Sequence, residues 1–168
     1  TAVSFSSTKN LFAVVDSKGH VTVYNAENGQ QVLTFEVSAP VHAMAFSPDS
    51  EYLALAGNGV TILDISADHQ VITLSDSDAT FSHIEFSADG MSLLASGNVT
   101  RIWNTRSWKL QREFAKSEGD YIGEVGFCTP SETLYAIESD QVIRRISEKD
   151  QREVELFRGH SDEPIGGE

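Results

Sequence analysis

The sequence predicts an all-β fold made of four copies of one four-stranded unit, and three observations support this. An aromatic residue with an apolar residue two places before it recurs at Phe5, Phe46, Phe86 and Phe127, at steps of 41, 40 and 41 residues. Another large apolar residue stands seven places after each of these phenylalanines. Between them run short segments of alternating apolar residues, without a sustained helical stripe. A period near 40 residues indicates stacked supersecondary units.

The second copy shows the expected elements of one unit. Its four strands are predicted at Val41 to Phe46, Tyr52 to Ala56, Val60 to Asp64 and Gln70 to Leu74. The segments between them are rich in Ser, Pro, Asp, Asn and Gly, which is typical of consecutive antiparallel hairpins. Applied along the whole chain, the pattern predicts one partial array over 1–168, with units at about 1–36, about 37–75, about 76–115 and about 116–158, and a fifth repeat beginning at 159–168.

A single four-stranded sheet cannot bury both of its apolar faces. Small Ala, Gly and Ser residues alternate with the large ones, which favours sheets packed face to face around an axis. That arrangement is a β-propeller, in which each sheet is one blade.

Several short motifs in register carry a family resemblance. They are Phe46-Ser-Pro-Asp49, Phe86-Ser-Ala-Asp-Gly90, Leu94-Ala-Ser-Gly97, Thr100-Arg-Ile-Trp-Asn104 and Gly159-His160. With these motifs the chain resembles the WD40-repeat family over essentially its whole length. The resemblance implies a WD40-like propeller segment of four four-stranded antiparallel blades.

The copies depart from the WD40 pattern at two positions. The Trp-Asp position reads Tyr24-Asn25, Leu63-Asp64 and Trp103-Asn104 in the first three copies, and Gly-His occurs clearly only at Gly159-His160. The buried polar network of the family is therefore largely missing. We expect the blades to be stabilised by apolar packing and by backbone hydrogen bonds between strands, with the four repeated phenylalanines near the blade cores.

Both ends of the sequence fall inside the repeat period. Thr1 enters within a first strand, and Ile165 stands where a fifth copy would place its first apolar residue. Four blades in an open arc would leave apolar faces uncovered. We therefore expect a larger ring of seven or eight blades, whose remaining blades come from the same longer chain or from a second copy; a closed four-bladed ring is the alternative.

Charge and composition exclude several classes of protein. The 168 residues carry a net charge of −13 and give a pI near 4.6, which disfavours nucleic acid as a partner. No apolar run is long enough to span a membrane and no charged-then-apolar leader opens the chain, so we expect no membrane insertion, no secretion, and a cytoplasmic or nuclear location. The single cysteine, Cys128, excludes an internal disulfide.

No catalytic, cofactor-binding or metal-binding motif is found, and the expectation is a protein that is not an enzyme. The segment Ser75-Asp76-Ser77-Asp78 lacks the glycine and the distant glutamate of a calcium loop. An enzyme using the propeller channel would need converging polar residues there. Only His83, Glu85 and Glu124 are isolated candidates.

One end of the propeller is the candidate partner-binding surface. WD40-like propellers bind partners at the loops that enter the first strand of a blade and at those between its second and third strands. In this sequence these loops carry Asp16, Lys18, Asp76, Asp78, Lys116, Glu118, Asp120, Tyr121, Glu138 and Asp140. Seven carboxylates against two lysines would attract a basic protein or peptide segment. Acidic turns that merely follow the overall composition explain the same residues equally well.

The sequence thus predicts a non-catalytic protein-interaction platform, a scaffold or adaptor. The alternative is a ligand-sensing or regulatory propeller lobe of a larger multidomain signalling protein.

Overall fold

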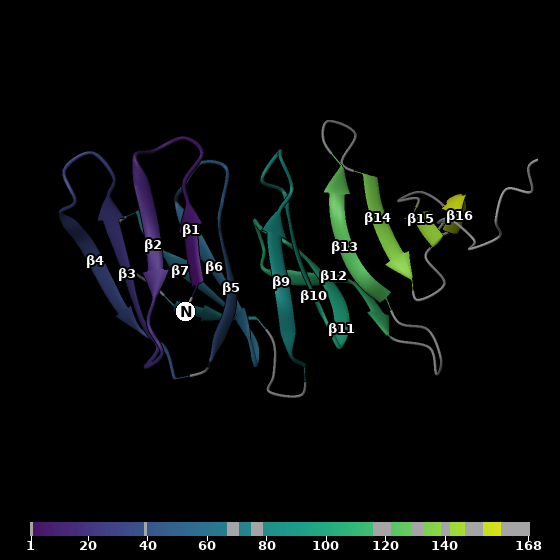
Figure 1. Ribbon diagram of the computed structural model, residues 1–168, viewed down its shortest axis with the longest axis horizontal. Coiled ribbons are helices and arrows are strands. Elements are labelled where there is room, and N and C mark those ends of the chain that lie inside the picture. The colour runs from purple at the N-terminus through teal and green to yellow at the C-terminus, as the bar shows by residue number, and fades with distance from the viewer. Residues whose placement is uncertain are drawn as a thin grey trace, which may run out of the picture. The chain divides into compact units, whose positions relative to one another are not determined.

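The computed structural model describes residues 2–38, 40–66, 71–74, 79–115, 122–128, 133–138, 142–146 and 153–158. Residue 71, residues 114–115 and the strands beyond 115, apart from residues 125–127, are described by their backbone alone. Within these ranges the elements are strands (Figure 1). In the same ranges there is no helix with the length and apolar character needed to cross a lipid bilayer.

The strands form four antiparallel sheets, each from four strands consecutive in the chain. The first sheet contains β1 (Ala2–Phe5), β2 (Leu11–Val15), β3 (His20–Asn25) and β4 (Gln31–Glu36). The second contains β5 (Val41–Phe46), β6 (Tyr52–Gly57), β7 (Gly59–Asp64) and β8 (Val71–Thr73). The third contains β9 (Phe81–Phe86), β10 (Ser92–Gly97), β11 (Val99–Asn104) and β12 (Lys109–Ala115). The fourth contains β13 (Ile122–Cys128), β14 (Thr133–Glu138), β15 (Val142–Ile146) and β16 (Glu153–Arg158).

The prediction of an all-β chain of four-stranded antiparallel sheets is confirmed. In the second sheet the observed strands coincide with the expected ones to within one residue at each end. The chain divides into two compact units, Thr1–Ala115 with the first three sheets and Lys116–Glu168 with the fourth. In the first unit, β1 lies beside β5 and β5 beside β9, so the leading strands of neighbouring sheets are adjacent (Figure 1).

A repeated serine and aspartate close the hairpin that follows the leading strand. Ser47 Oγ donates to Asp49 Oδ1 at 2.5 Å and accepts from the backbone N–H of Tyr52 at 3.0 Å. Ser87 repeats this geometry, with Asp89 Oδ1 at 2.7 Å and the N–H of Ser92 at 2.9 Å. Because Ser47 and Ser87 are buried, the motif satisfies polar groups that would otherwise be costly to bury.

The core of the first unit lies between neighbouring sheets. The second and third sheets each turn a row of large residues toward the sheet before them, where they meet mostly smaller residues. Phe46, Leu53 and Leu63 of the second sheet cluster with Ala13 and Val15 of the first. In the same way Leu93 and Trp103 of the third sheet cluster with Ala54, Ala56 and Ile62 of the second. Large side chains over small ones give the close packing of protein interiors.

The repeated phenylalanines do not share one environment. Phe46 is buried and Phe86 is half-buried, as expected of residues near the core. Phe5 is 71% exposed, so the expectation was wrong for this residue. The reason is its position in the first sheet, since no sheet of the first unit precedes that face.

Candidate functional site

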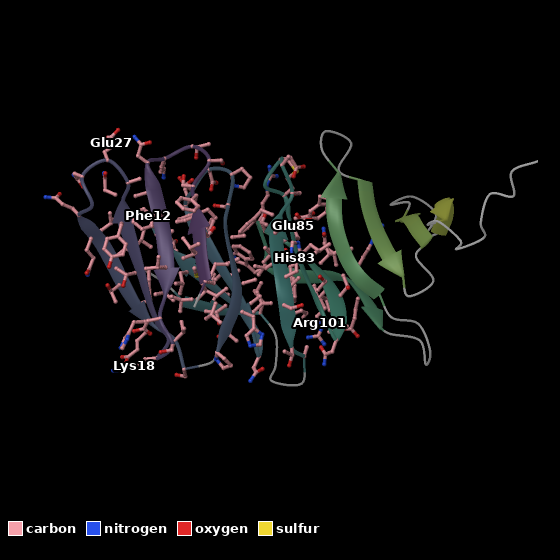
Figure 2. The ribbon with its side chains drawn as sticks, in the orientation of Figure 1. Phe12, Lys18, Glu27, His83, Glu85 and Arg101 are labelled. Carbon is pink, nitrogen blue, oxygen red and sulfur yellow. The ribbon has the colours of Figure 1, made fainter. Side chains whose placement is uncertain are left out.

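The turn between β2 and β3 is built around the carboxylate of Asp16. Asp16 Oδ1 accepts hydrogen bonds from the backbone N–H groups of Lys18 at 2.7 Å and His20 at 2.9 Å. An aspartate that accepts from an N–H two residues further on closes an Asx turn, which is why this residue type suits the position. The turn holds the Asp16 side chain in one orientation and leaves Lys18 exposed at the tip (Figure 2).

Gly19 brings this turn against the segment that leads into the second sheet. It has a φ of 89°, which favours glycine. A Cβ atom here would lie 2.2 Å from the carbonyl oxygen of Val37, whose own N–H donates to the Gly19 carbonyl at 3.0 Å. A side chain at residue 19 would therefore force the two segments apart.

His20 links two carboxylates at this end of the sheet. Its Nδ1 lies 2.8 Å from Asp16 Oδ2 and its Nε2 lies 3.5 Å from Glu36 Oε1. The pKa of Asp16 is lowered to about 2, mainly by the side-chain hydrogen bond from His20 and further by the backbone hydrogen bonds from His20 and Lys18. The side-chain hydrogen bond also raises the pKa of His20, and the charge of Asp16 raises it further. Asp16 is thus ionised at neutral pH, and its negative charge stabilises the protonated form of His20 relative to the neutral form.

A hollow of about 430 Å³ lies next to this cluster. Its described lining comes from the β2–β3 turn, the segment after β4 and the start of β5: Asp16, Ser17, Lys18, Gly19, Val37, Ser38, Pro40, Val41 and His42. The lining combines a carboxylate, an ammonium group, an imidazole and backbone groups with few large apolar side chains. Such a surface suits a peptide segment better than an apolar small molecule.

The structure brings together two of the residues predicted to bind a partner, Asp16 and Lys18. The side chains of the other eight are not among those that the structure describes. Glu138 is the last residue of β14 and its side chain is not described, while Asp76, Asp78, Lys116, Glu118, Asp120, Tyr121 and Asp140 lie outside the described residues. The proposed acidic face is therefore described only at its Asp16 end.

Three further residues of this end were not among the predicted site residues. His20 and Glu36 are directly opposite each other in the register of β3 and β4, and His42 lines the hollow from β5. The signal for His20 is its spacing of four residues from Asp16 across a turn. Glu36 is the last residue of β4, and it could be recognised as a partner of His20 only once the register of β3 and β4 is known.

The strand β9 carries two of the residues considered for a channel enzyme. His83 Nε2 lies 3.8 Å from Glu85 Oε2, and both side chains are partly exposed (Figure 2). The side chain of Glu124, the third candidate, is not described. Among the described residues, no three or more His, Cys, Asp or Glu side chains group in a way that could hold a metal ion.

Comparison with known proteins identifies the repeat. Residues 3–89, just over half of the chain, match the family model described as the anaphase-promoting complex subunit 4 WD40 domain. The chain belongs to the WD40-repeat family. The resemblance inferred from the short motifs is confirmed, and each four-stranded sheet corresponds to a WD40 blade.

Two curated relatives agree with this assignment. Pre-mRNA-processing factor 19 from Oryza sativa subsp. japonica is 28% identical over 127 residues, which cover 73% of this chain and 24% of the relative. The small ribosomal subunit protein RACK1 from Candida albicans is 28% identical over 114 residues, which cover 61% of this chain and 36% of the relative. The matched part of the WD40 chain thus spans about a quarter of one relative and just over a third of the other. In general, WD40 proteins are protein-interaction scaffolds.

Proposed function

We propose that this WD40 chain is a non-catalytic scaffold that binds a basic segment of a protein partner at the end of the blades bearing Asp16 and Lys18. The observation that carries the proposal is the hollow beside Asp16, which is bounded by the β2–β3 turn and by the segment after β4. Hydrogen bonds within the turn, and one from the Val37 N–H to the Gly19 carbonyl, hold these two parts together. A preformed site reduces the entropy lost when a peptide is ordered on it.

Electrostatics supports a basic partner. The chain carries a net charge of −13, and Asp16 and Glu36 add two carboxylates near the hollow. Asp76, Asp78, Glu118, Asp120, Glu138 and Asp140 are predicted from the sequence to extend this charge, with Lys116 and Tyr121 among them. A field of one sign raises the association rate of an oppositely charged segment and weakens as salt screens it.

The test uses a lysine- and arginine-rich peptide as the probe. Asp16→Asn removes one charge from the proposed face and keeps the acceptor oxygen of the turn, whereas Glu27→Gln removes one charge from an exposed turn at the other end. Fluorescence anisotropy at low and high salt measures the affinity. Weaker binding of the first variant alone, at low salt, supports the proposal. Equal losses in both variants would show that only net charge matters and would overturn it.

We also propose that a further blade of the same repeat array, in a longer protein, covers the outer face of the first sheet. Phe5 and Val3 are 71% and 54% exposed on that face, while the equivalent row of the next two sheets packs against a preceding sheet. A longer chain that supplies this blade is expected to melt at a higher temperature and to bind less of a hydrophobic dye than residues 1–168. A defined dimer of residues 1–168 would instead indicate that a second copy covers the face.

We also propose an intracellular location, which is supported by the names of the two relatives. The names of the two relatives refer to pre-mRNA processing and to the small ribosomal subunit, which are both intracellular. Imaging of a tagged full-length protein tests this location, and a secreted product would contradict it.

A further inference from the structure

A second hollow of about 430 Å³ lies between the second and third sheets, at the end of the strands opposite to Lys18. It is bounded by the β5–β6, β9–β10 and β11–β12 turns. This is the end at which Figure 2 labels Glu27 on the first sheet. We call it the notch and define it by Tyr52, Phe86, Trp108, Asp49 and Asp89, which all line it.

Three aromatic rings line the notch. The rings of Tyr52 and Trp108 meet edge to face, with centroids 5.3 Å apart and planes inclined by 78°. Phe86 adds a third, half-buried ring from β9. Two rings at nearly a right angle form a corner, and an aromatic face attracts a cation placed over it.

Two carboxylates, those of Asp49 and Asp89, also line the notch. Oδ1 of Asp49 accepts from the N–H of Glu51 at 3.0 Å, and Oδ1 of Asp89 accepts from the N–H of Met91 at 2.7 Å. These bonds hold both carboxylates, which are exposed, in one orientation. Burial raises the pKa of the Tyr52 phenol, and the charges of Asp64, Glu51 and Asp49 raise it further, which indicates a negative potential at this ring.

The backbone at Trp108 supports a functional role for its ring. Trp108 has a φ of 53°, and its N–H donates to the carbonyl of Asn104 at 2.8 Å. In the equivalent turn of the first sheet the same place is taken by Gly29, with a φ of 70° and a matching bond to Asn25 at 2.9 Å. A tryptophan therefore occupies a left-handed position that glycine would fill without strain. Strained residues of this kind concentrate at binding sites.

We propose that the notch binds the cationic side chain of a lysine or arginine from a protein partner. The ammonium or guanidinium group would lie over the aromatic corner, with its charge balanced by Asp49 and Asp89. This site is separate from the Asp16 end, and so a partner could engage either end or both. Among the described residues lining the notch, Arg106 is the basic one, and it is exposed on the turn that carries Trp108.

Arg106 makes the sign of the ligand testable. If the notch takes a cation, Arg106 competes with it, and Arg106→Gln should tighten binding. If the notch takes an anion, Arg106 is the group that would hold it, and the same substitution should abolish binding.

The experiment is an NMR titration of the 168-residue chain with Nα-acetyl-lysine amide and Nα-acetyl-arginine amide. Trp103 is buried, so its indole N–H serves as an internal reference for that of Trp108. A saturable shift of the Trp108 resonance alone is expected. Nα-acetyl-norleucine amide, which has an uncharged chain of similar length, should produce no shift.

Two variants separate binding from folding. Asp49→Asn with Asp89→Asn keeps the acceptor oxygens of both turns and should raise the dissociation constant about threefold to tenfold. Its control, Glu27→Gln with Glu36→Gln, has the same net charge and should leave the affinity unchanged. Trp108→Gly keeps the left-handed turn and should remove binding detected through the resonances of neighbouring backbone amides.

Three results would overturn the proposal. They are an equal response to the norleucine probe, weaker binding by Arg106→Gln, or unchanged binding in a folded Trp108→Gly variant. The variants that change the notch leave the Asp16 end unchanged, and only the control alters Glu36 there. Failure at the notch therefore leaves the proposed scaffold function to be judged separately.

Discussion

Phe12 stacks on Tyr24 across β2 and β3, with ring centroids 5.2 Å apart and planes inclined by 17°. Phe5 extends the row from β1, at 6.1 Å from the ring of Phe12. These three residues are register partners, as are Phe46, Leu53 and Leu63 in the second sheet. The row in the second sheet is buried against the first sheet, whereas the row in the first sheet remains accessible.

This difference predicts unequal effects of one substitution at equivalent positions. Phe5→Ala should lower the free energy of unfolding by about 1 kcal/mol or less, because little area is buried there. Phe46→Ala should cost about 3–5 kcal/mol, since it leaves a cavity between two sheets. Urea denaturation of both variants measures the difference. Phe5→Ala should also reduce concentration-dependent association in sedimentation velocity. Equal destabilisation by the two substitutions would contradict the proposed exposed face.

The hydrogen bond between Asp16 and His20 predicts a pH dependence. The pKa of Asp16 is lowered to about 2 from its usual 3.8, so its stabilising contribution is complete above about 3.8 and is lost as the pH falls toward 2. The pKa of His20 is raised above its usual 6.5, so its contribution is complete below 6.5 and is lost as the pH rises through the raised value. Both contributions are present together between about pH 4 and 6.5.

An NMR titration of the His20 ring tests this coupling directly. Asp16→Asn should move the pKa of His20 back toward 6.5, since Asp16 is the main cause of the shift. Glu36→Gln should move it less, because Glu36 lies at 3.5 Å and contributes a smaller effect. If Glu36→Gln had the larger effect, the assignment of the Nδ1 bond to Asp16 would be wrong.

Gly19 and Gly29 offer a matched pair of alanine substitutions. Both have positive φ, 89° and 70°, and both lie in turns of the first sheet. A Cβ atom at Gly29 meets no atom within 4 Å, whereas one at Gly19 would lie 2.2 Å from the Val37 carbonyl. Gly29→Ala should therefore cost about 1 kcal/mol from backbone strain alone. Gly19→Ala should cost more, about 3 kcal/mol, and should disturb the amide resonance of Val37. Equal melting temperatures for the two variants would show that the segments separate freely.

The buried serine of the hairpin motif predicts a loss of stability on removal of one oxygen. Ser87→Ala should cost about 1–3 kcal/mol, because the N–H of Ser92 loses its 2.9 Å partner away from water. Ser82→Ala, at an exposed position on the same leading strand, should change stability by less than about 0.5 kcal/mol. Chemical denaturation compares the two, and a negligible effect at Ser87 would argue against a structural role for the motif.

The strands could be predicted from the sequence because the information they need is local. Alternating apolar residues between turn-forming residues set the side-chain period of a strand, and the 40-residue spacing made four copies of one sheet evident. The second sheet was located almost residue by residue for this reason. The Asx turn at Asp16 is also local, since its partners lie within four residues.

The sites could be predicted only in part, because their residues are distant in sequence. Tyr52 and Trp108 belong to different sheets and meet only when these sheets pack. No local pattern in the sequence indicates that these two rings are partners. Glu36 lies opposite His20 because of the register in which β3 and β4 pair. The sequence does not fix this register, because the turn between the two strands could have one of several lengths.

By itself, the sequence determined the all-β class, the four-stranded unit and its repetition, because strand period and turn chemistry act between near neighbours. The tertiary structure decided which copy of the repeated phenylalanine is buried. Phe5 and Phe46 stand in the same local pattern, and they differ only in whether another sheet lies over them. Burial depends on the packing of a whole face, and a pattern that is identical in two copies cannot encode a difference in their surroundings.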